Sequence, residues 1–287
     1  MKLQDIKISG FADEISDDFV EQLEGLKENN IKYIEIRGVN GKNISVLNHD
    51  EMIEAKKLLD KYEIKVSSIG SPIGKFDITG DFDVHLKVYE NVLAAAKIFD
   101  TEYIRMFSFF LPQEDRKGDG YKKYRDDVIS RLEKLVELAD EHQVILCHEN
   151  EGGIYGESPE ACLDLMKYFN GRIKFVFDPA NFIVGGFTPY PDAYNMLSEY
   201  IEYMHIKDAN SEGIMPAGLG DGKIKEILAD LYAKGFDNFL TVEPHLSVFK
   251  GLDELGGSEN VKNKFKTKEE AFKVAVESLR AVLPINK

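Results

Sequence analysis

The sequence predicts an α/β fold in which eight strands alternate with eight helices along one domain, residues 1–287. Short β-branched and aromatic runs alternate with longer amphipathic stretches throughout, which is typical of repeated strand–helix units and a parallel sheet. No run rich in Pro, Gly and Ser divides the chain. Eight strands, each followed by a helix, is the count of a closed (β/α)8 TIM barrel. We therefore predict a single TIM barrel.

The expected strands are short apolar runs bounded by charges or turn residues. They lie at 6–9, 32–37, 64–69, 102–107, 143–149, 173–178, 201–206 and 239–243. The expected helices have apolar residues at three- and four-residue spacing. They lie at 16–29, 49–61, 83–99, 121–141, 158–169, 188–198, 222–234 and 267–282. Of the two long strand–helix loops, 107–120 and 244–266, the second is rich in Gly and charge and could be a lid or a homo-oligomer contact.

The composition restricts the classes of partner. The formal net charge is −15 and the pI is near 4.9, whereas nucleic acids and anionic membranes are held by Lys and Arg. We therefore expect no nucleic acid and no membrane partner. Two cysteines, Cys147 and Cys162, provide neither a disulfide framework nor a paired-cysteine zinc motif. Because the first residues lack the features of a signal peptide and no apolar run approaches a membrane span, we expect a cytoplasmic protein.

Polar residues lie at or next to the ends of the last four expected strands. They are Glu149, Asp178, His205 and Glu243. Because the inside of such a barrel is usually filled by Val, Ile and Leu, a carboxylate at a last inward position must be solvated, paired or bound to a metal. One such glutamate could be an ordinary ion-pair partner, but one polar end on each of four consecutive strands is more than packing requires. Oxygen ligands with one imidazole favour Mn²⁺, with Mg²⁺, Co²⁺ or Zn²⁺ as alternatives.

Motifs along nearly the whole chain carry a family resemblance. They are GFADEIS, YIEIR, CHEN, FVFDPAN, YMHIKDAN, GLGDGKI and TVEPH. On these motifs the chain resembles the xylose-isomerase-like barrels, specifically the sugar phosphate isomerase/epimerase group that includes ketose 3-epimerases, hydroxypyruvate isomerases and inosose dehydratases. The resemblance implies that Glu149, Asp178, His205 and Glu243 are metal ligands. It also implies that Glu149 and Glu243 form the acid/base pair.

Two positions depart from the pattern of this family. Asn181 stands three residues after Asp178, where the epimerases usually have His. The stretch ANSEGIMPAG that follows HIKD lacks the arginine with which many members hold a substrate oxygen. An amide can hydrogen-bond a hydroxyl group but is no acid or base near neutral pH, so we expect Asn181 to position the substrate. Both departures concern the substrate rather than the fold.

Further polar residues near strand ends are candidates for substrate contact. Glu35 and Arg37 lie two residues apart at the end of the second expected strand, where one could touch the substrate or the two could form a buried pair with each other or with Arg105. Arg105 is itself a candidate for substrate contact, and Lys207 could bind a substrate oxygen or lie at the surface. His148 is also a candidate, although it should point to the opposite side of its strand from Glu149. A hydrogen-bonded structural histidine is therefore the competing interpretation of His148.

Two other features near these strand ends are open to more than one interpretation. Asp208 could orient a metal ligand from behind. Gly218, Gly220 and Gly222 precede an expected helix, where free amide groups would suit a phosphate or a plain polar turn. These residues could therefore serve ligand binding or local structure.

The chemistry of this residue set favours an enzyme acting on a small sugar or polyol. A divalent ion that chelates a carbonyl and a neighbouring hydroxyl stabilises the enediolate formed when a C–H proton is removed, and Glu149 and Glu243 could remove and return that proton. We expect a metal-dependent sugar or sugar phosphate isomerase or epimerase. The alternatives are a polyol or inosose dehydratase, a multi-zinc endonuclease, which six histidines and the acidic balance oppose, and a non-catalytic cytosolic sugar-binding barrel.

Overall fold

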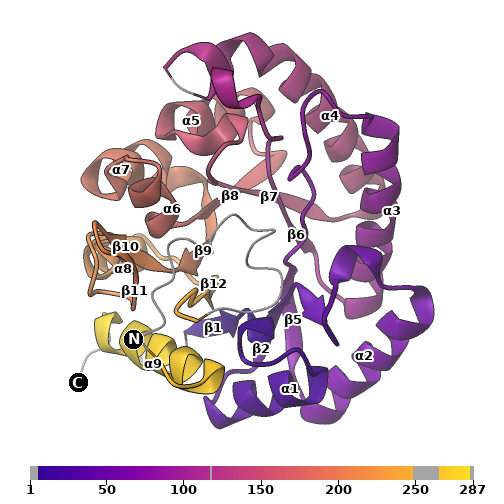
Figure 1. The fold of residues 1–287 in the computed structure, drawn as a ribbon, viewed down its shortest axis with the longest axis vertical. Coiled ribbons are helices and arrows are strands. Elements are labelled where there is room, and N and C mark those ends of the chain that lie inside the picture. Colours follow the sequence, from indigo (N-terminus) through magenta and orange to yellow (C-terminus); the bar gives the residue numbers. More distant parts are fainter. Residues whose placement is uncertain (1–5, 117, 248–264, 285–287) are drawn as a thin grey trace.

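The computed structural model describes residues 6–116, 118–247 and 265–284, in which eight strands form a closed barrel with the order β1-β12-β9-β8-β7-β6-β5-β2. The strands are β1 (Lys7–Gly10), β2 (Tyr33–Ile36), β5 (Lys65–Ile69), β6 (Tyr103–Met106), β7 (Ile145–Glu149), β8 (Ile173–Phe177), β9 (Ile201–Ile206) and β12 (Phe239–Val242). β1 pairs in parallel with both β2 and β12, which closes the ring. Figure 1 shows the helices as an outer layer around the strands. The predicted TIM barrel is confirmed.

The helices begin where side-chain caps or turns allow. They are α1 (Phe19–Glu28), α2 (His49–Tyr62), α3 (Phe82–Phe99), α4 (Arg125–His142), α5 (Pro159–Phe169), α6 (Pro179–Val184), α7 (Tyr194–Leu197), α8 (Ile224–Ala233) and α9 (Lys268–Val282). α1 starts later than position 16 because the Asp18 side chain accepts the N–H groups of Val20 and Glu21. A 3₁₀ turn, Gly120–Tyr124, precedes α4, so this helix also begins later than expected.

The connection between β8 and β9 differs from the single expected helix at 188–198. α6 follows β8 at once, because Asp178 accepts the Asn181 N–H and Pro179 occupies the first helical position. The expected helix is divided into a π-helical turn (Pro189–Ala193), α7 and a 3₁₀ turn (Ser198–Tyr200). As a result, Asp178 follows a barrel strand directly and also caps a helix.

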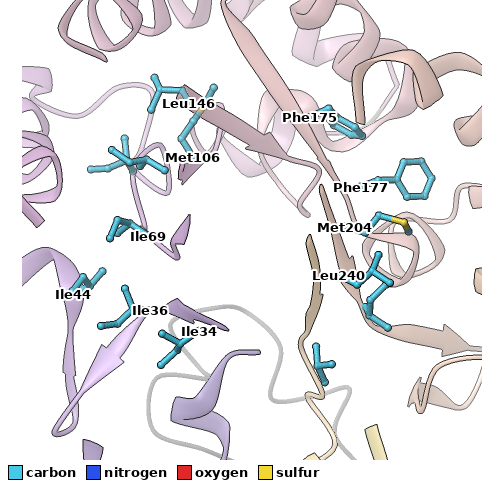
Figure 2. Close-up of a cluster of buried hydrophobic side chains, with 14 of the residues drawn as sticks. Ile34, Ile36, Ile44, Ile69, Met106, Leu146, Phe175, Phe177, Met204 and Leu240 are labelled. Atoms are coloured by element: carbon cyan, nitrogen blue, oxygen red, sulfur yellow. The ribbon is translucent and has the colours of Figure 1, made fainter. Parts of the chain in front are cut away.

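Alternation of side chains along the strands separates an apolar layer from a polar barrel axis. Residues such as Ile34, Leu146 and Met204 belong to the main hydrophobic cluster, whose members surround the barrel in Figure 2. The intervening positions carry a small separate cluster that includes Cys147 and Tyr203. The polar residues of the candidate site follow the same alternation as these two residues. They are Glu35, Arg105, Glu149, Asp178, His205, Lys207 and Glu243.

Loops and two short hairpins extend beyond the strands. β3 (Gly38–Val39) pairs with β4 (Lys42–Asn43), and β10 (Asp208–Asn210) pairs with β11 (Gly213–Met215). Most of the loop 244–266, namely residues 248–264, lies outside the described residues, so its expected role as a lid or homo-oligomer contact stays a prediction. None of the helices in the described ranges is both long and apolar enough to cross a membrane.

Candidate metal centre and active site

The four strand-end residues meet at one mouth of the barrel. Glu149 ends β7, Asp178 and Glu243 directly follow β8 and β12, and His205 lies in β9. One potential ligand atom from each lies within 4.8 Å of the others, and the residues are 0 to 2% exposed. Three carboxylates this close need nearby positive charge. The buried cluster therefore suits a divalent metal.

Both ring nitrogens of His205 face carboxylates. Nδ1 lies 2.9 Å from Oε1 of Glu149 and 3.6 Å from Oε2 of Glu243, whereas Nε2 lies 3.2 Å from Oε2 of Glu35. Burial lowers the pKa of His205, but Glu149 and Glu35 outweigh this effect and raise it to about 10. Histidine ligands commonly present one nitrogen to the metal and donate the other N–H to a carboxylate. Glu35 would thus leave Nδ1 as the nitrogen that faces the metal.

The two oxygens of Glu149 have different partners. Oε1 faces His205, and Oε2 accepts a hydrogen bond from Nη1 of Arg105 at 3.2 Å. Burial raises the pKa of this carboxyl, but His205 and Arg105 lower it further, to about 2. Glu149 is therefore ionised at neutral pH, as a metal ligand or a proton acceptor must be.

Glu243 is surrounded by cationic groups. Its Oε2 accepts from Nζ of Lys207 at 2.9 Å, and its Oε1 accepts from Nη1 of Arg37 at 3.1 Å. Burial alone would raise its pKa, yet Lys207, His245, His205 and Arg37 hold the pKa well below the usual range. The carboxylate is thus charged and held at both oxygens.

Asp178 is fixed by its backbone and by one of its oxygens. The Asn150 side chain accepts the Asp178 N–H at 3.0 Å and donates to its carbonyl at 2.9 Å. Oδ1 accepts from the backbone of Asn181 at 3.0 Å. Oδ2 is 2.9 Å from Nζ of Lys207, but no hydrogen bond of good geometry reaches this buried oxygen from the described residues. Burial raises the pKa of Asp178, and a metal would satisfy Oδ2.

Three expected substrate-binding residues lie beside the cluster. The half-buried Asn181 donates through Nδ2 to Oε1 of Glu149 at 3.3 Å and to the Asn150 carbonyl at 2.9 Å. Lys207 lies 2.9 Å from both Asp178 and Glu243. Arg105 is only 2% exposed and also donates to the Gly70 carbonyl at 3.2 Å. Arg105 therefore supports Glu149, and its guanidinium is not exposed to solvent.

Two other residues expected to contact the substrate are buried and have partners within the protein. Glu35 is fully buried, and its other oxygen accepts from the Tyr203 hydroxyl at 3.1 Å. His148 lies on the opposite face of its strand, where its ring stacks on Phe175 and its Nε2 is 2.9 Å from the Ser108 hydroxyl. Burial lowers the pKa of His148 to about 3. It therefore resembles the structural histidine of the competing interpretation.

A second group of possible ligands adjoins the first. Glu14, Glu243 and His245 bring one ligand atom each within 4.8 Å of one another. The Arg37 guanidinium, however, lies 3.2 Å from Glu14 and 3.1 Å from Glu243. This group shares Glu243 with the first cluster and adds only two ligands of its own, so we assign the metal to the four-residue cluster. The contacts of Asn150, Arg37 and Glu14 were not predicted from the sequence.

The glycines after β9 enclose a carboxylate of the chain itself. The amide groups of Gly218, Gly220 and Gly222 donate to Asp208 at 2.9, 3.0 and 2.8 Å. A Cβ at position 220 would lie 2.3 Å from Oδ1 of Asp208. These amide groups are therefore not available to a phosphate, and the motif shapes the loop that follows Lys207.

Solved structures with this fold include enzymes and metal-binding proteins. The probable 3-DHS dehydratase AsbF of Bacillus anthracis is 17% identical, with a TM-score of 0.72 over 96% of this chain and 99% of that one. D-psicose 3-epimerase of Clostridium cellulolyticum H10, solved with D-tagatose, is 15% identical, with a TM-score of 0.72 over 98% and 100%. The IOLI protein, solved with a zinc atom, is 18% identical, with a TM-score of 0.72 over 97% and 98%. At these identities the likeness shows the shared fold.

The sequence itself matches a family over most of its length. No curated protein matches the chain. Residues 23–281 match the family described as xylose isomerase-like TIM barrel. The match covers seven of the eight barrel strands and the whole buried cluster of carboxylates and histidine. The chain belongs to the xylose isomerase-like TIM barrel family.

Proposed function

We propose that this protein is a divalent-metal-dependent isomerase or epimerase of a sugar or sugar phosphate. The observation that carries the proposal is the convergence of Glu149, Asp178, His205 and Glu243 within 4.8 Å at a barrel mouth. Membership of a family whose fold includes a ketose epimerase supports it. The oxygen-rich ligand set favours Mn²⁺, with Mg²⁺, Co²⁺ and Zn²⁺ as alternatives.

The acid/base work is assigned to Glu149 and Glu243. A divalent ion here would polarise a substrate carbonyl and stabilise the negative charge that develops when the adjacent C–H proton is removed. The two glutamates come from strands separated in the ring by β8 and β9, so they would approach a substrate from different sides. Removal of a proton by one and delivery by the other gives epimerisation, whereas return to the neighbouring carbon gives isomerisation.

The substrate-positioning work is assigned to Lys207 and Asn181. Lys207 lies at the oxygens that face the cluster, where its ammonium group can donate to a substrate hydroxyl or carbonyl. Both Nδ2 hydrogens of Asn181 have acceptors in the protein. Its Oδ1 is therefore the atom that would accept a hydrogen bond from a substrate hydroxyl. Arg105 is assigned to supporting Glu149.

A dehydratase is the second candidate. A structural neighbour is a probable 3-DHS dehydratase, and Asn181 stands where the epimerases usually carry a histidine. After removal of the C–H proton, a hydroxyl group on the next carbon would leave with a proton as water. The carbon skeleton would then carry a new double bond, and no external oxidant is needed.

The test is proton exchange in D₂O with a panel of ketoses, ketose phosphates and polyols in the presence of Mn²⁺. Wild type is expected to incorporate deuterium into at least one ketose, measured by NMR. Glu149→Gln and Glu243→Gln should each slow exchange by about 10²-fold or more. Glu226→Gln, an exposed change on α8, is the control. Loss of water from a panel member would favour the dehydratase. If the protein binds metal but no panel member reacts, the non-catalytic sugar-binding barrel is the remaining interpretation.

A further inference from the structure

Arg37 connects Glu243, a candidate metal ligand, to the segment that follows β1. It follows β2 directly and is 4% exposed. Nη1 donates to Oε1 of Glu243 at 3.1 Å, while Nε and Nη2 donate to the two oxygens of Asp13 at 2.8 and 3.0 Å. Nη2 also lies 3.2 Å from Oε1 of Glu14. One planar guanidinium thus fixes three carboxylates at once.

The groups that hold Arg37 come from the connection after β1. Asp13 and Glu14 lie in the 3₁₀ turn Ala12–Glu14, and Phe11 precedes it. The fully buried ring of Phe11 lies 4.3 Å from the Arg37 guanidinium. Glu14 also accepts the backbone N–H of His245 at 2.7 Å. The connection after β1 therefore holds the Glu243 side chain, through Arg37, and also holds the backbone at His245.

The contact has a consequence for the free oxygen of Glu243. A glutamate side chain has several rotatable bonds, whereas a guanidinium held on both edges has a fixed plane. With Oε1 on Arg37, Oε2 is directed to Lys207 at 2.9 Å and towards Nδ1 of His205 at 3.6 Å. The contact of Oε1 with Arg37 therefore sets the position of Oε2, the oxygen that would bind the metal.

Charge alone predicts the opposite effect on metal binding. A guanidinium near the centre repels a divalent cation, so its removal should tighten metal binding if Arg37 contributed only charge. If Arg37 contributes geometry, its removal should weaken binding. The sign of the change therefore separates the two roles.

We propose that Arg37 is a positioning residue for Glu243. Asp13 and Phe11 hold the guanidinium of Arg37, which in turn fixes the position of the Glu243 oxygen that would bind the metal. The proposal rests on the proposed metal centre. Arg37→Lys keeps the charge but loses the planar fork, and Arg37→Gln loses both. Both variants are therefore expected to bind the metal more weakly.

Calorimetric titration with Mn²⁺ tests this role. Arg37→Lys and Arg37→Gln should each weaken Mn²⁺ binding about tenfold or more. The matched control is Arg125→Lys, because Arg125 pairs with both oxygens of Asp164, at 2.8 and 2.9 Å, in the outer layer of helices. Binding by Arg37→Gln that equals or exceeds that of wild type overturns the proposal. Failure of wild type to bind Mn²⁺ overturns the metal centre instead.

Two further variants cover misfolding and specificity. If the Arg37 variants have lost their folded circular dichroism spectrum, Asp13→Asn is tested in their place. This change weakens the contacts that Asp13 makes with the Arg37 guanidinium and should weaken Mn²⁺ binding several-fold. Unchanged affinity would overturn the proposal. In a Glu243→Gln background, Arg37→Gln should add less than about a twofold change, because residues that act through one contact are not additive. A full additional loss in that background would show that Arg37 does not act through Glu243.

Discussion

Glu35 and His205 face each other across the barrel axis, with Oε2 of Glu35 3.2 Å from Nε2 of His205. The two residues come from β2 and β9, which are not neighbours in the ring. The contact fixes the imidazole so that Nδ1 points at Glu149 and Glu243. A residue expected to touch substrate thus lies behind a candidate metal ligand.

Glu35→Gln should weaken Mn²⁺ binding about tenfold, because a neutral amide neither raises the basicity of the ligating imidazole nor fixes it as firmly. Isothermal titration of purified protein measures this change. Glu202→Gln is the matched control, since Glu202 also accepts from a tyrosine hydroxyl, that of Tyr103 at 2.7 Å, but does not belong to the cluster. Equal affinities for Glu35→Gln and wild type would show that the contact does not support the metal site.

Asp208→Asn should lower the free energy of unfolding by about 2–3 kcal/mol. In wild type several backbone N–H groups donate to both oxygens of a carboxylate, whereas the amide of the variant has a single acceptor oxygen and no charge. The affected donors include Gly218, Gly220 and Gly222. Chemical denaturation measures the change. The nearby exposed Asp221→Asn should remain within about 0.5 kcal/mol of wild type. A similar small effect at Asp208 would contradict this role.

Asn181→Ala should raise KM for the best sugar of the panel several-fold, because it removes the acceptor assigned to a substrate hydroxyl, a contact of about 0.5–1.5 kcal/mol. Mn²⁺ affinity should change much less. Steady-state kinetics, together with Mn²⁺ titration, separate these effects. The exposed Asn195→Ala on α7 serves as the control. If KM is unchanged while Mn²⁺ binding falls, Asn181 instead acts on Glu149, to which it donates at 3.3 Å.

His85 should make stability fall in mild acid. Its Nε2 accepts the Gly74 N–H at 2.9 Å and its ring stacks on Phe76. Burial, with a smaller effect of Arg131, lowers its pKa from 6.5 to about 4. The unfolded chain therefore binds the proton first, so this contribution is fully present above about pH 7 and is lost as the pH falls from about 6.5 to about 4.

The expected loss from His85 between pH 7 and pH 5 is about 2 kcal/mol. Denaturant titrations of wild type and His85→Gln at the two pH values measure it, because the glutamine variant should lose correspondingly less stability on acidification. The exposed Asn195→Ala, which changes no titratable group, should keep the wild-type dependence. Parallel pH profiles for wild type and His85→Gln would count against the assignment.

The sequence predicted the features that follow from periodicity. Strand ends of a parallel barrel lie at one mouth, so Glu149, Asp178, His205 and Glu243 could be expected to meet. Alternation also indicated that His148 lies on the opposite side of its strand from Glu149. α6 was missed although the pair Asp178–Pro179 is a helix-start signal.

Contacts across the barrel could not be predicted in the same way. The pairing of Arg37 with Glu243 spans 206 positions of sequence, and that of Glu35 with His205 spans 170. Which side chains meet depends on strand tilt and register, including the register shift between Ile34 and Glu35 in β2. These determinants leave no local pattern in the sequence.

Metal stoichiometry tests the central claim most directly. Wild-type protein, Asp178→Asn/His205→Gln and the exposed control Glu226→Gln would each be equilibrated with Mn²⁺, separated from free ion and analysed by mass spectrometry of the metal. Wild type and control are expected to retain about one Mn²⁺ per chain, and the double variant about a tenth of that or less, since two of the four ligands are removed. Wild type without bound metal, or a folded double variant that retains as much as wild type, would contradict the assignment of these four residues.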